Sequence, residues 1–402
     1  MTKTPQPHPV PFGTVLALVA LAMGGFGIGT GEFAIMGLLP DVAGEFSISP
    51  PQAGYAISAY ALGVVLGAPI LAVFFARVPR KIMLMGLMAA FALGNLASAF
   101  APGFVWLVVF RFMAGLPHGA YFGIAGLVAA EIVAPEKRAQ AIGRMMLGIS
   151  LSNVLGVPLV TWFGQLASWR AAFAFVGMVG VVTIVLLFVF APKIAVAEGA
   201  SPLRELGALA RKQVWLTLAV GSIGFGGMFA VYSYIAPTLI HAAGAAPATV
   251  PLVMSVFGVG MILGSIAGGW MADRALHRTI WVLLLWNVVV LGGFTFIGYS
   301  LAGATLVVFL MGCGVAIVPA MQMRLMEVAH HAQTLASSLN HSALNIGNAL
   351  GAWLGGLSIV AGYGWTSTGW VGAALALGGM MIFAVSMALE SMDRRKLAAC
   401  PA

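Results

Sequence analysis

Three ionisable residues interrupt the long apolar stretches of this sequence, namely Glu32, Arg111 and His118. A charge at the centre of a membrane-spanning helix costs about 2.5–3.5 kcal/mol on insertion scales, so residues of this kind usually mark a route for ions or substrates. Removing water from a carboxyl group favours its neutral form, whereas a neighbouring guanidinium favours its charged form. A carboxyl group whose surroundings alternate between these conditions can carry protons. We therefore predict that Glu32 carries protons, with a static, hydrogen-bonded glutamate as the alternative.

Arg111 and His118 are separated by two turns of an α-helix and so share one helix face. Gly115 and Gly119 lie on or near that face, where small residues let two membrane helices approach closely. Arg111 could tune the carboxyl group or only brace backbone carbonyl groups, and His118 could relay protons or only pack. We predict that both act with Glu32 in proton coupling.

The composition requires that these residues be held inside a membrane. The chain has 402 residues, of which 61% are hydrophobic and 7% are charged, and its mean hydropathy is +1.03. Soluble domains carry roughly 25% charged residues, so a soluble protein is excluded. The apolar runs are continuous, whereas the strands of an outer-membrane barrel alternate apolar and polar residues. The net charge of +8 is spread thinly over the ends of these runs, so membrane lipid is expected as a partner and nucleic acid is not.

A helix that crosses the bilayer needs about 20 apolar residues. On this basis the sequence predicts an all-α membrane protein with twelve transmembrane helices, over residues 12–38, 52–75, 81–100, 104–131, 139–165, 170–190, 214–237, 248–271, 279–299, 302–326, 334–360 and 367–389. The longest polar stretch between spans falls in the middle. We therefore expect an N-terminal six-helix bundle over 1–191, a cytoplasmic linker over 192–213 and a C-terminal six-helix bundle over 214–402.

The two bundles repeat one pattern, which makes them pseudo-symmetric. At a nearly constant separation of half the chain, Pro40 matches Pro237, Glu131 matches Glu327, Asn153-Val154-Leu155-Gly156 matches Asn348-Ala349-Leu350-Gly351, and Trp169 matches Trp365. Glu32 breaks the repeat, because its counterpart is Phe229. Duplicated apolar halves are typical of transporters whose substrate site lies between the repeats.

The basic residues predict the orientation, because cytoplasmic loops of membrane proteins carry an excess of Lys and Arg. If both termini are cytoplasmic, nearly all Lys and Arg residues fall on the cytoplasmic side, and Arg170 is the one that falls in an outside loop. We expect a multi-pass protein of a bacterial-type inner (plasma) membrane. The sequence contains no charged oligomerisation segment, so a monomer is the default expectation.

Several segments resemble the major facilitator superfamily over nearly the whole chain. Residues 67–81 and their echo at 269–278 are similar to the family signature of the loop between spans 2 and 3, and Arg111 with Gly115 and Gly119 resembles the span 4 motif implicated in proton transfer. Gly148, Gly156 and Pro158 resemble the span 5 signature of exporters. Residues 32–43 resemble the twelve-span drug:proton antiporter group, and residues 60–69, 111–120 and 153–158 resemble its arabinose-efflux-permease type.

The resemblance implies a cytoplasmic gate, and here the chain departs from the family pattern. The signature acid of the first loop is Ala76 and the signature glycine is Pro79, whereas Asp273 keeps the acid in the second half. The first-half gate would then use basic residues against Glu131, and the second half would use its charges against Glu327. The candidate gate residues are Arg77, Arg80, Lys81, Glu131, Asp273, Arg274, Arg278 and Glu327, and the alternative is that the basic ones only fix the topology.

Polar residues within apolar spans are candidates for a substrate cavity, although each could instead bind a neighbouring helix. They are Tyr60, Asn153, Tyr232, Tyr234, Gln322, Asn345 and Asn348. We predict a proton-coupled transporter that exports small organic molecules of the sugar or drug class by alternating access. A proton-independent facilitator, an importer of a small polar solute and a substrate sensor with a transporter fold are the alternatives.

An intramembrane enzyme is not expected. The sequence contains neither a G-x-S-x-G nor an H-E-x-x-H pattern, and His330-His331 has no acidic residues at useful spacing for a metal site. The two cysteines, Cys313 and Cys400, suggest neither a disulfide framework nor metal ligation. We expect no cofactor and no metal, and the expected partners besides lipid are protons and a small-molecule substrate.

Overall fold

The computed structural model describes residues 12–74, 78–134, 138–192, 210–329 and 333–399, and these residues form helices and short connections without a strand. The first half of the chain contains α1 (Phe12–Gly37), α2 (Leu39–Glu45), α3 (Pro50–Ala53), α4 (Tyr55–Phe74), α5 (Arg80–Ala99), α6 (Phe104–Glu131), α7 (Arg138–Leu151), η2 (Ser152–Gly156), α8 (Val157–Leu166) and α9 (Trp169–Phe190). These elements are called the N half below.

The second half, called the C half, contains α11 (Lys212–Ala219), η4 (Val220–Gly224), α12 (Gly226–Tyr232), α13 (Ile235–His241), η5 (Pro247–Thr249), α14 (Val250–Ile297), α15 (Leu301–Gly314), α16 (Ile317–Ala329), α17 (Gln333–Val360), η6 (Trp365–Ser367) and α18 (Thr368–Ala399). The helix α14 holds two spans, because the chain turns at Ala275, where φ is −157° and ψ is 72°. The linker expected over 192–213 lies mostly outside the described residues.

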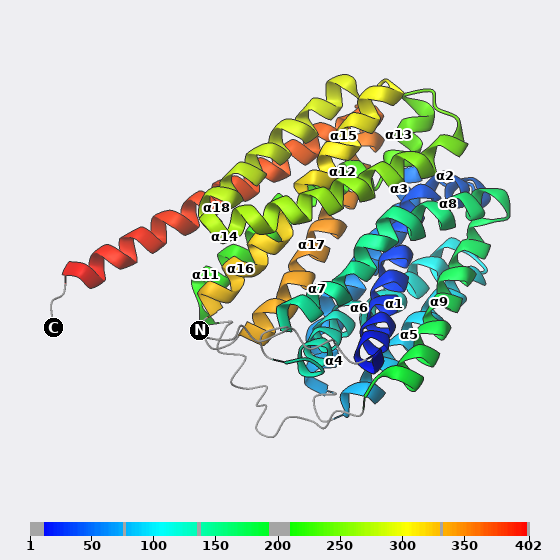
Figure 1. The fold of residues 1–402 in the computed structure, drawn as a ribbon. Helices are drawn as coiled ribbons and strands as arrows, with labels where there is room; N and C mark the ends of the chain where they lie inside the picture. Colours follow the sequence, from blue (N-terminus) through cyan, green and yellow to red (C-terminus); the bar gives the residue numbers. More distant parts are fainter. Residues whose placement is uncertain (1–11, 75–77, 135–137, 193–209, 330–332, 400–402) are drawn as a thin grey trace, which may run out of the picture.

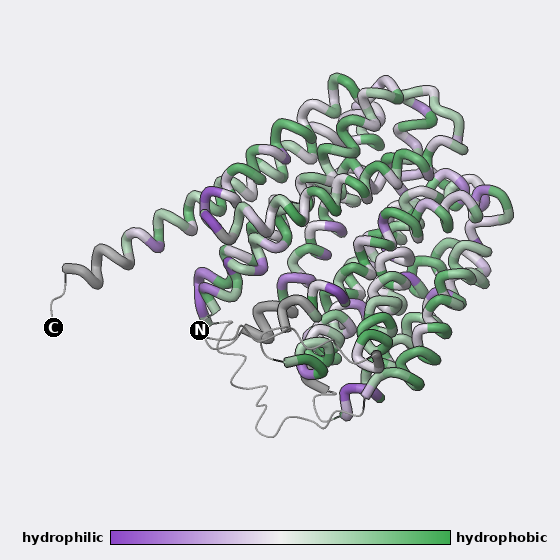
Figure 2. The backbone as a smooth tube through the Cα atoms, viewed as in Figure 1, coloured by the Kyte–Doolittle hydropathy of each residue, from purple (hydrophilic) through white to green (hydrophobic). Residues whose placement is uncertain are grey.

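Twelve helices in the described residues are long and apolar enough to cross a membrane, which confirms the all-α fold with twelve spans. Their bounds differ from the expected ones by a few residues. Span 7 runs over Lys212–His241 and span 8 over Pro247–Ala272, for example, where we expected 214–237 and 248–271. Apolar residues run along the full length of the helices, and hydrophilic residues gather at the start of α11 and at the turn within α14 (Figure 2).

Two spans are less regular than the hydropathy pattern predicts. Span 5 passes through the π-helical turn η2, and span 7 passes through the π-helical turn η4 and breaks again at Ser233–Tyr234. Hydropathy reports only the length of an apolar run, so it cannot detect a change in helix winding. Turns of this kind are rare and are frequently found at functional sites.

The helices of each half pack mainly against one another, and α17 of the C half lies beside α4 and α6 of the N half (Figure 1). A second seam is formed where α14 packs against η2 and α8. The backbones come very close there, because a Cβ atom added at Gly258 would lie 2.5 Å from the carbonyl oxygen of Asn153. These two seams hold the halves together.

The molecule has two chemically different ends. The end formed by α2, α3, α13, η5 and η6 is called the α2–α3 end, and Leu38 and Leu39 are fully buried there. The opposite end, where α1 begins and α18 ends, is called the basic end, because the described parts of the chain place there Arg80, Lys81, Arg211, Lys212, Arg274, Arg278 and Arg324.

Arg170 is the exception to this distribution, and its charge is matched at the α2–α3 end. Its Nε and Nη2 atoms donate to Oε1 of Glu45 at 2.9 and 2.7 Å, and its Nη1 donates to the carbonyl oxygens of Ala99 and Ala101. Trp169 donates from Nε1 to the other oxygen of Glu45 at 2.5 Å. One guanidinium thus ties α2, α5 and α9 together.

Glycines let α4 and α6 approach until their backbones touch. A Cβ atom at Gly67 would lie 2.0 Å from the carbonyl oxygen of Leu116, and one at Gly115 would lie 2.1 Å from that of Tyr60. In the exporter signature of span 5, a Cβ atom at Gly148 would lie 1.9 Å from the carbonyl oxygen of Ala22 on α1. Spans 1, 2, 4 and 5 therefore form one closely packed block around Glu32.

We predict that Gly67→Val destabilises the protein by about 1–3 kcal/mol, because backbone cannot move away from the added side chain. The matched control is Gly86→Val on α5, where nothing lies within 4 Å of the added Cβ atom. Thermal unfolding of the purified protein, followed by the loss of monodisperse material, would measure both variants. Equal melting temperatures for the two would contradict this account of the packing.

Candidate functional site

Glu32 lies in the last turns of α1 and is only 5% exposed. Its Oε1 atom accepts a hydrogen bond of 3.1 Å from Nδ2 of Asn348, on α17 of the C half. A buried charge is expensive unless it is paired or hydrogen-bonded, so this amide stabilises the charged form of Glu32. The hydrogen bond also connects the two halves of the molecule across their seam.

His118 lies next to Glu32, and α4 holds its ring in place. Its Nδ1 atom is 3.9 Å from Oε2 of Glu32 and 3.1 Å from the hydroxyl oxygen of Tyr60. Tyr60 reaches this position because the glycines described above bring α4 against α6. Both side chains are almost fully buried. The structure therefore brings together the acid, the imidazole and a phenol hydroxyl.

Arg111 braces the backbone beside Glu32 without forming an ion pair with it. Its Nη1 atom donates to the carbonyl oxygen of Gly31 at 2.9 Å, and its guanidinium lies 4.3 Å from the ring centre of Tyr60. The side chain is fully buried, and its Nε and Nη2 atoms have no hydrogen-bond partner among the described residues. The structure thus shows the bracing of a backbone carbonyl group that we considered for Arg111.

His341, on α17, completes the cluster, and the sequence analysis missed it. Its ring stacks on Phe122 of α6 with 5.4 Å between ring centres and 5° between ring planes, and its centre is 6.3 Å from that of His118. A signal was available, because His341, Asn345 and Asn348 recur at the spacing of one helix face. The pattern shows only when the polar residues of one helix face are taken together.

The amide side chains near the seam share one feature. Asn345 donates from Nδ2 to the carbonyl oxygen of His341, and Asn153 of η2 donates to that of Ile149, both within about one helical turn. The Oδ1 atoms of Asn153, Asn345 and Asn348 are buried and have no partner among the described residues. These oxygens can accept hydrogen bonds from a solute or from water.

Aromatic rings close the seam on the side towards the α2–α3 end. Phe33 stacks on Phe229, the counterpart of Glu32 in the repeat, at 6.2 Å, and meets Tyr232 edge-on at 5.9 Å. Tyr232 in turn stacks on Phe257 at 4.1 Å, and its buried hydroxyl group has no partner among the described residues. These buried rings join the two halves on that side of Glu32.

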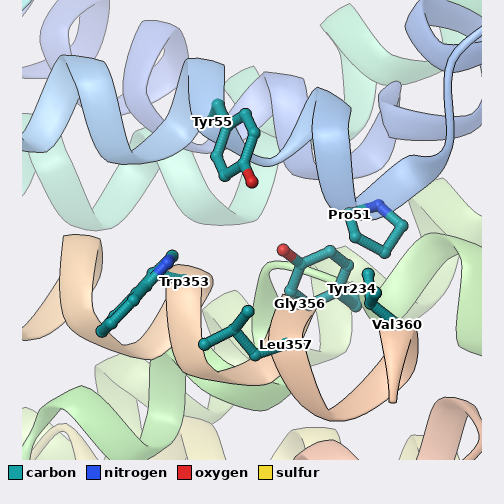
Figure 3. Close-up of a pocket in the computed structure, with 7 residues that line it drawn as sticks. All are labelled: Pro51, Tyr55, Tyr234, Trp353, Gly356, Leu357 and Val360. Carbon is teal, nitrogen blue, oxygen red and sulfur yellow. The ribbon is translucent and has the colours of Figure 1, made fainter. Parts of the chain in front are cut away.

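Two candidate cavity residues lie elsewhere. Tyr234 donates from its hydroxyl group to the carbonyl oxygen of Ala352 at 2.7 Å and lines a small pocket at the α2–α3 end (Figure 3). The other lining residues are Pro51, Tyr55, Trp353, Gly356, Leu357 and Val360. Gln322 is partly exposed on α16. Neither contacts Glu32 or His118 among the described residues, so the structure does not bring them to the cluster.

At the basic end of the N half, Arg80 pairs with Glu131 and so links α5 to α6. Lys81 instead donates to the carbonyl oxygen of Phe188 on α9 at 2.7 Å. Arg77 lies outside the described residues. Of the two candidate basic residues that the structure describes there, Arg80 makes the pairing considered for Glu131.

In the C half, the glutamates at the basic end pair with an arginine that was not among the candidate gate residues. Arg324 of α16, which is buried, pairs with Glu390 of α18 at 2.5 Å and with Glu327 at 3.4 Å, and it also contacts His277. Glu327 thus pairs with Arg324 rather than with Arg274 or Arg278. Arg274 lies over the ring of Trp270 on its own helix, at 3.8 Å, and Arg278 is exposed. Asp273 belongs to α14, and its side chain is not among those described.

Each of the described ion pairs at the basic end joins two residues of the same half. Contacts on the side of the α2–α3 end, in contrast, join residues of different halves. Ser58 donates to the carbonyl oxygen of Ala349, and Gln165 donates to that of Pro247. The described part of the chain contains no group of three or more His, Cys, Asp or Glu residues that could hold a metal ion. Glu32 offers a buried carboxyl group beside the seam between the halves, and the asparagine oxygens described above offer hydrogen-bond acceptors there.

Sequence comparison agrees with this architecture. The chain matches the Major Facilitator Superfamily over residues 21–334 and again over residues 218–399. It is 41% identical to the inner membrane transport protein YdhP of Escherichia coli K12, over 89% of this chain and 92% of that protein. It is 32% identical to the putative transporter AraJ of Escherichia coli K12 (90% and 93%) and 29% identical to a probable sugar efflux transporter of Helicobacter pylori (90% and 93%).

Solved structures show the same fold at low sequence identity. A bacterial homologue of the human lysosomal transporter Spinster superposes with a TM-score of 0.69 at 19% identity, covering 98% of this chain and 100% of that one. A D-xylose–proton symporter superposes with a TM-score of 0.72 at 14% identity, covering 93% and 97%. With twelve spans, a duplicated architecture and a family match over most of its length, the chain belongs to the major facilitator superfamily of membrane transporters.

Proposed function

We propose that this transporter exports small organic molecules of the sugar or drug class in exchange for protons, by alternating access. The observation that carries the proposal is the buried carboxyl group of Glu32, which is bonded to Asn348 of the opposite half. A proton bound there changes a contact between the halves. The proposal thus links protonation directly to the relative position of the two bundles.

The coupling follows from the strength of this hydrogen bond in the charged and in the neutral form of Glu32. Hydrogen bonds to charged groups contribute about 1.5–3 kcal/mol, and those between neutral groups about 0.5–1.5 kcal/mol. Protonation of Glu32 therefore weakens the contact with Asn348 by about 1 kcal/mol. The charged form favours the arrangement in which α1 and α17 are in contact, and the neutral form favours their separation.

His118 and Arg111 support the same role. Arg111 holds the backbone of Gly31 and so fixes the end of α1 that carries Glu32. His118 lies near enough to share a proton with Glu32 after a small rotation, since the separation is 3.9 Å. By linkage, exchange requires that protons and solute favour different states of the transporter.

The substrate site in this proposal lies between the halves, beside Glu32. The unpartnered oxygens of Asn153, Asn345 and Asn348 can accept hydrogen bonds from the hydroxyl groups of a sugar or the ammonium group of a drug. The rings of Phe33, Phe229 and Tyr232 supply an apolar wall. Two of the relatives are named as probable sugar efflux transporters, which favours the sugar class.

The direction of transport is proposed from the sequence. With the basic end and both termini in the cytoplasm, the α2–α3 end faces outward, and the contacts described above join the halves on that side. The span 5 glycines that resemble the exporter signature pack span 5 against span 1, next to Glu32. The charges at the basic end, including the Arg80–Glu131 and Arg324–Glu390 pairs, would then form the cytoplasmic gate of a monomer in an inner membrane.

We predict that Glu32→Gln abolishes proton-driven transport, because an amide cannot release a proton. Proteoliposomes with an imposed pH gradient would be supplied in turn with L-arabinose, D-xylose, ethidium and tetraphenylphosphonium, and solute and proton movement would be recorded together. The wild type should dissipate the gradient with one class of solute. The matched control is Asp41→Asn, an acid on α2 outside the spans, which should behave as the wild type.

Solute movement without protons in both the wild type and Glu32→Gln would identify a facilitator with a structural glutamate. If the wild type binds one of these solutes but moves neither solute nor protons, the sensor alternative holds instead. Either result would overturn the proposed exchange.

A second prediction concerns Asn348→Ala, which removes the hydrogen-bond donor from Glu32. We expect proton-driven flux to fall by about tenfold, corresponding to the loss of one hydrogen bond to a charged group. The control is Asn287→Ala on α14, another buried asparagine. Equal flux in the two variants, at equal protein content, would show that Asn348 serves only packing.

A further inference from the structure

Within the part of the chain that the structure describes, the buried Glu32–His118 pair has one titratable neighbour with access to solvent. Glu32 is 5% exposed and His118 is 2% exposed, and Tyr60 and Arg111 beside them are fully buried. His341 contacts His118 and is partly exposed. Among the described residues, any proton that reaches the pair through a titratable side chain must therefore pass His341.

The position of His341 along α17 places it towards the basic end. The helix begins at Gln333 near that end and finishes at Val360 at the α2–α3 end. His341 precedes Asn348, the partner of Glu32, by two turns, which corresponds to about 10 Å along the axis. It therefore stands between the buried pair and the basic-end side of the seam.

The geometry points to His341 as a proton relay between the Glu32–His118 pair and the water on the basic-end side. This inference rests on the proposed function, and it adds a residue to which no role in coupling has been given. In the transfer, protonated His118 releases an N–H proton to a neutral ring nitrogen of His341, directly or through one water molecule. His341 then releases a proton to solvent, so both rings end neutral and no charge is created or lost.

Imidazole suits this step because its neutral form carries one donor and one acceptor nitrogen. The stack on Phe122 fixes the plane of the His341 ring, so that its edge is presented in a constant direction. If His118 and His341 were both positively charged, 6.3 Å apart in a buried site, they would repel each other, which favours at most one positive charge on these two rings at a time. The other charged or titratable groups described around the cluster are Glu32 on α1, Tyr60 on α4 and Arg111 on α6.

The relay can be tested without knowing the transported solute. The purified full-length protein would be subjected to a rapid pH jump, and the carboxyl stretching band of Glu32 would be followed by time-resolved infrared spectroscopy. The band is assigned by its loss in Glu32→Gln. We expect His341→Phe, which keeps a ring on Phe122 but cannot carry a proton, to slow the protonation of Glu32 by about tenfold or more.

The equilibrium midpoint of the Glu32 titration separates a relay from a structural role. A relay changes the rate and leaves the midpoint unchanged, whereas a disturbed site shifts the midpoint. His341→Gln should slow the reaction as His341→Phe does, which guards against an effect of ring shape. The matched control is His241→Gln, since His241 also stacks on an aromatic ring, that of Trp365 at 5.2 Å, but lies at the α2–α3 end.

Wild-type rates in both His341 variants would overturn the relay and leave the proposed function standing. A shift of the midpoint with unchanged rates would also overturn it, in favour of a structural role for His341. If the Glu32 band does not change with pH in the wild type, the coupling role of Glu32 fails as well. The two failures are therefore distinguishable.

Discussion

The hydrogen bond from Asn348 to Glu32 is the interaction on which the rest of the site depends, because it places a carboxylate away from water and ties it to the opposite half of the molecule. A carboxylate in such surroundings needs fixed partners. The glycines of α4 and α6 bring Tyr60 against His118, and Arg111 holds the end of α1 through the Gly31 carbonyl group. The close packing of the helices thus brings the neighbours of Glu32 into position.

The architecture was predictable because its cause is local. A run of about 20 apolar residues must cross the membrane whatever its neighbours are, and Glu32, Arg111 and His118 stand out against such runs. Contacts between distant helices were not predictable in this way. Arg324 turned out to hold Glu390 and Glu327, and Tyr234 turned out to lie in the pocket at the α2–α3 end. Which polar residues of twelve helices come into contact depends on how the helices pack against one another.

The two halves share a sequence pattern but contribute different side chains to the site. The N half supplies the acid, the arginine and His118, whereas the C half supplies His341, two of the asparagines and, at the position matching Glu32, the ring of Phe229 that packs on Phe33. The basic end is likewise unequal, with a link between α5 and α6 in one half and a buried arginine cluster in the other. The duplicated helices repeat the fold, whereas a single difference at equivalent positions, Glu32 in one half and Phe229 in the other, places the acid in one half.

The hydrogen bonds between Arg170 and Glu45 have a consequence for the biogenesis of the protein. If the basic end lies in the cytoplasm, as we propose, Arg170 must be moved outward against a membrane potential that is negative inside, at about 2.3 kcal/mol per charge and 100 mV. Glu45 precedes it in the chain and so is already outside when Arg170 arrives, and their two hydrogen bonds compensate for part of this work. The order in which the spans are synthesised thus provides the counter-charge before the charge that needs it.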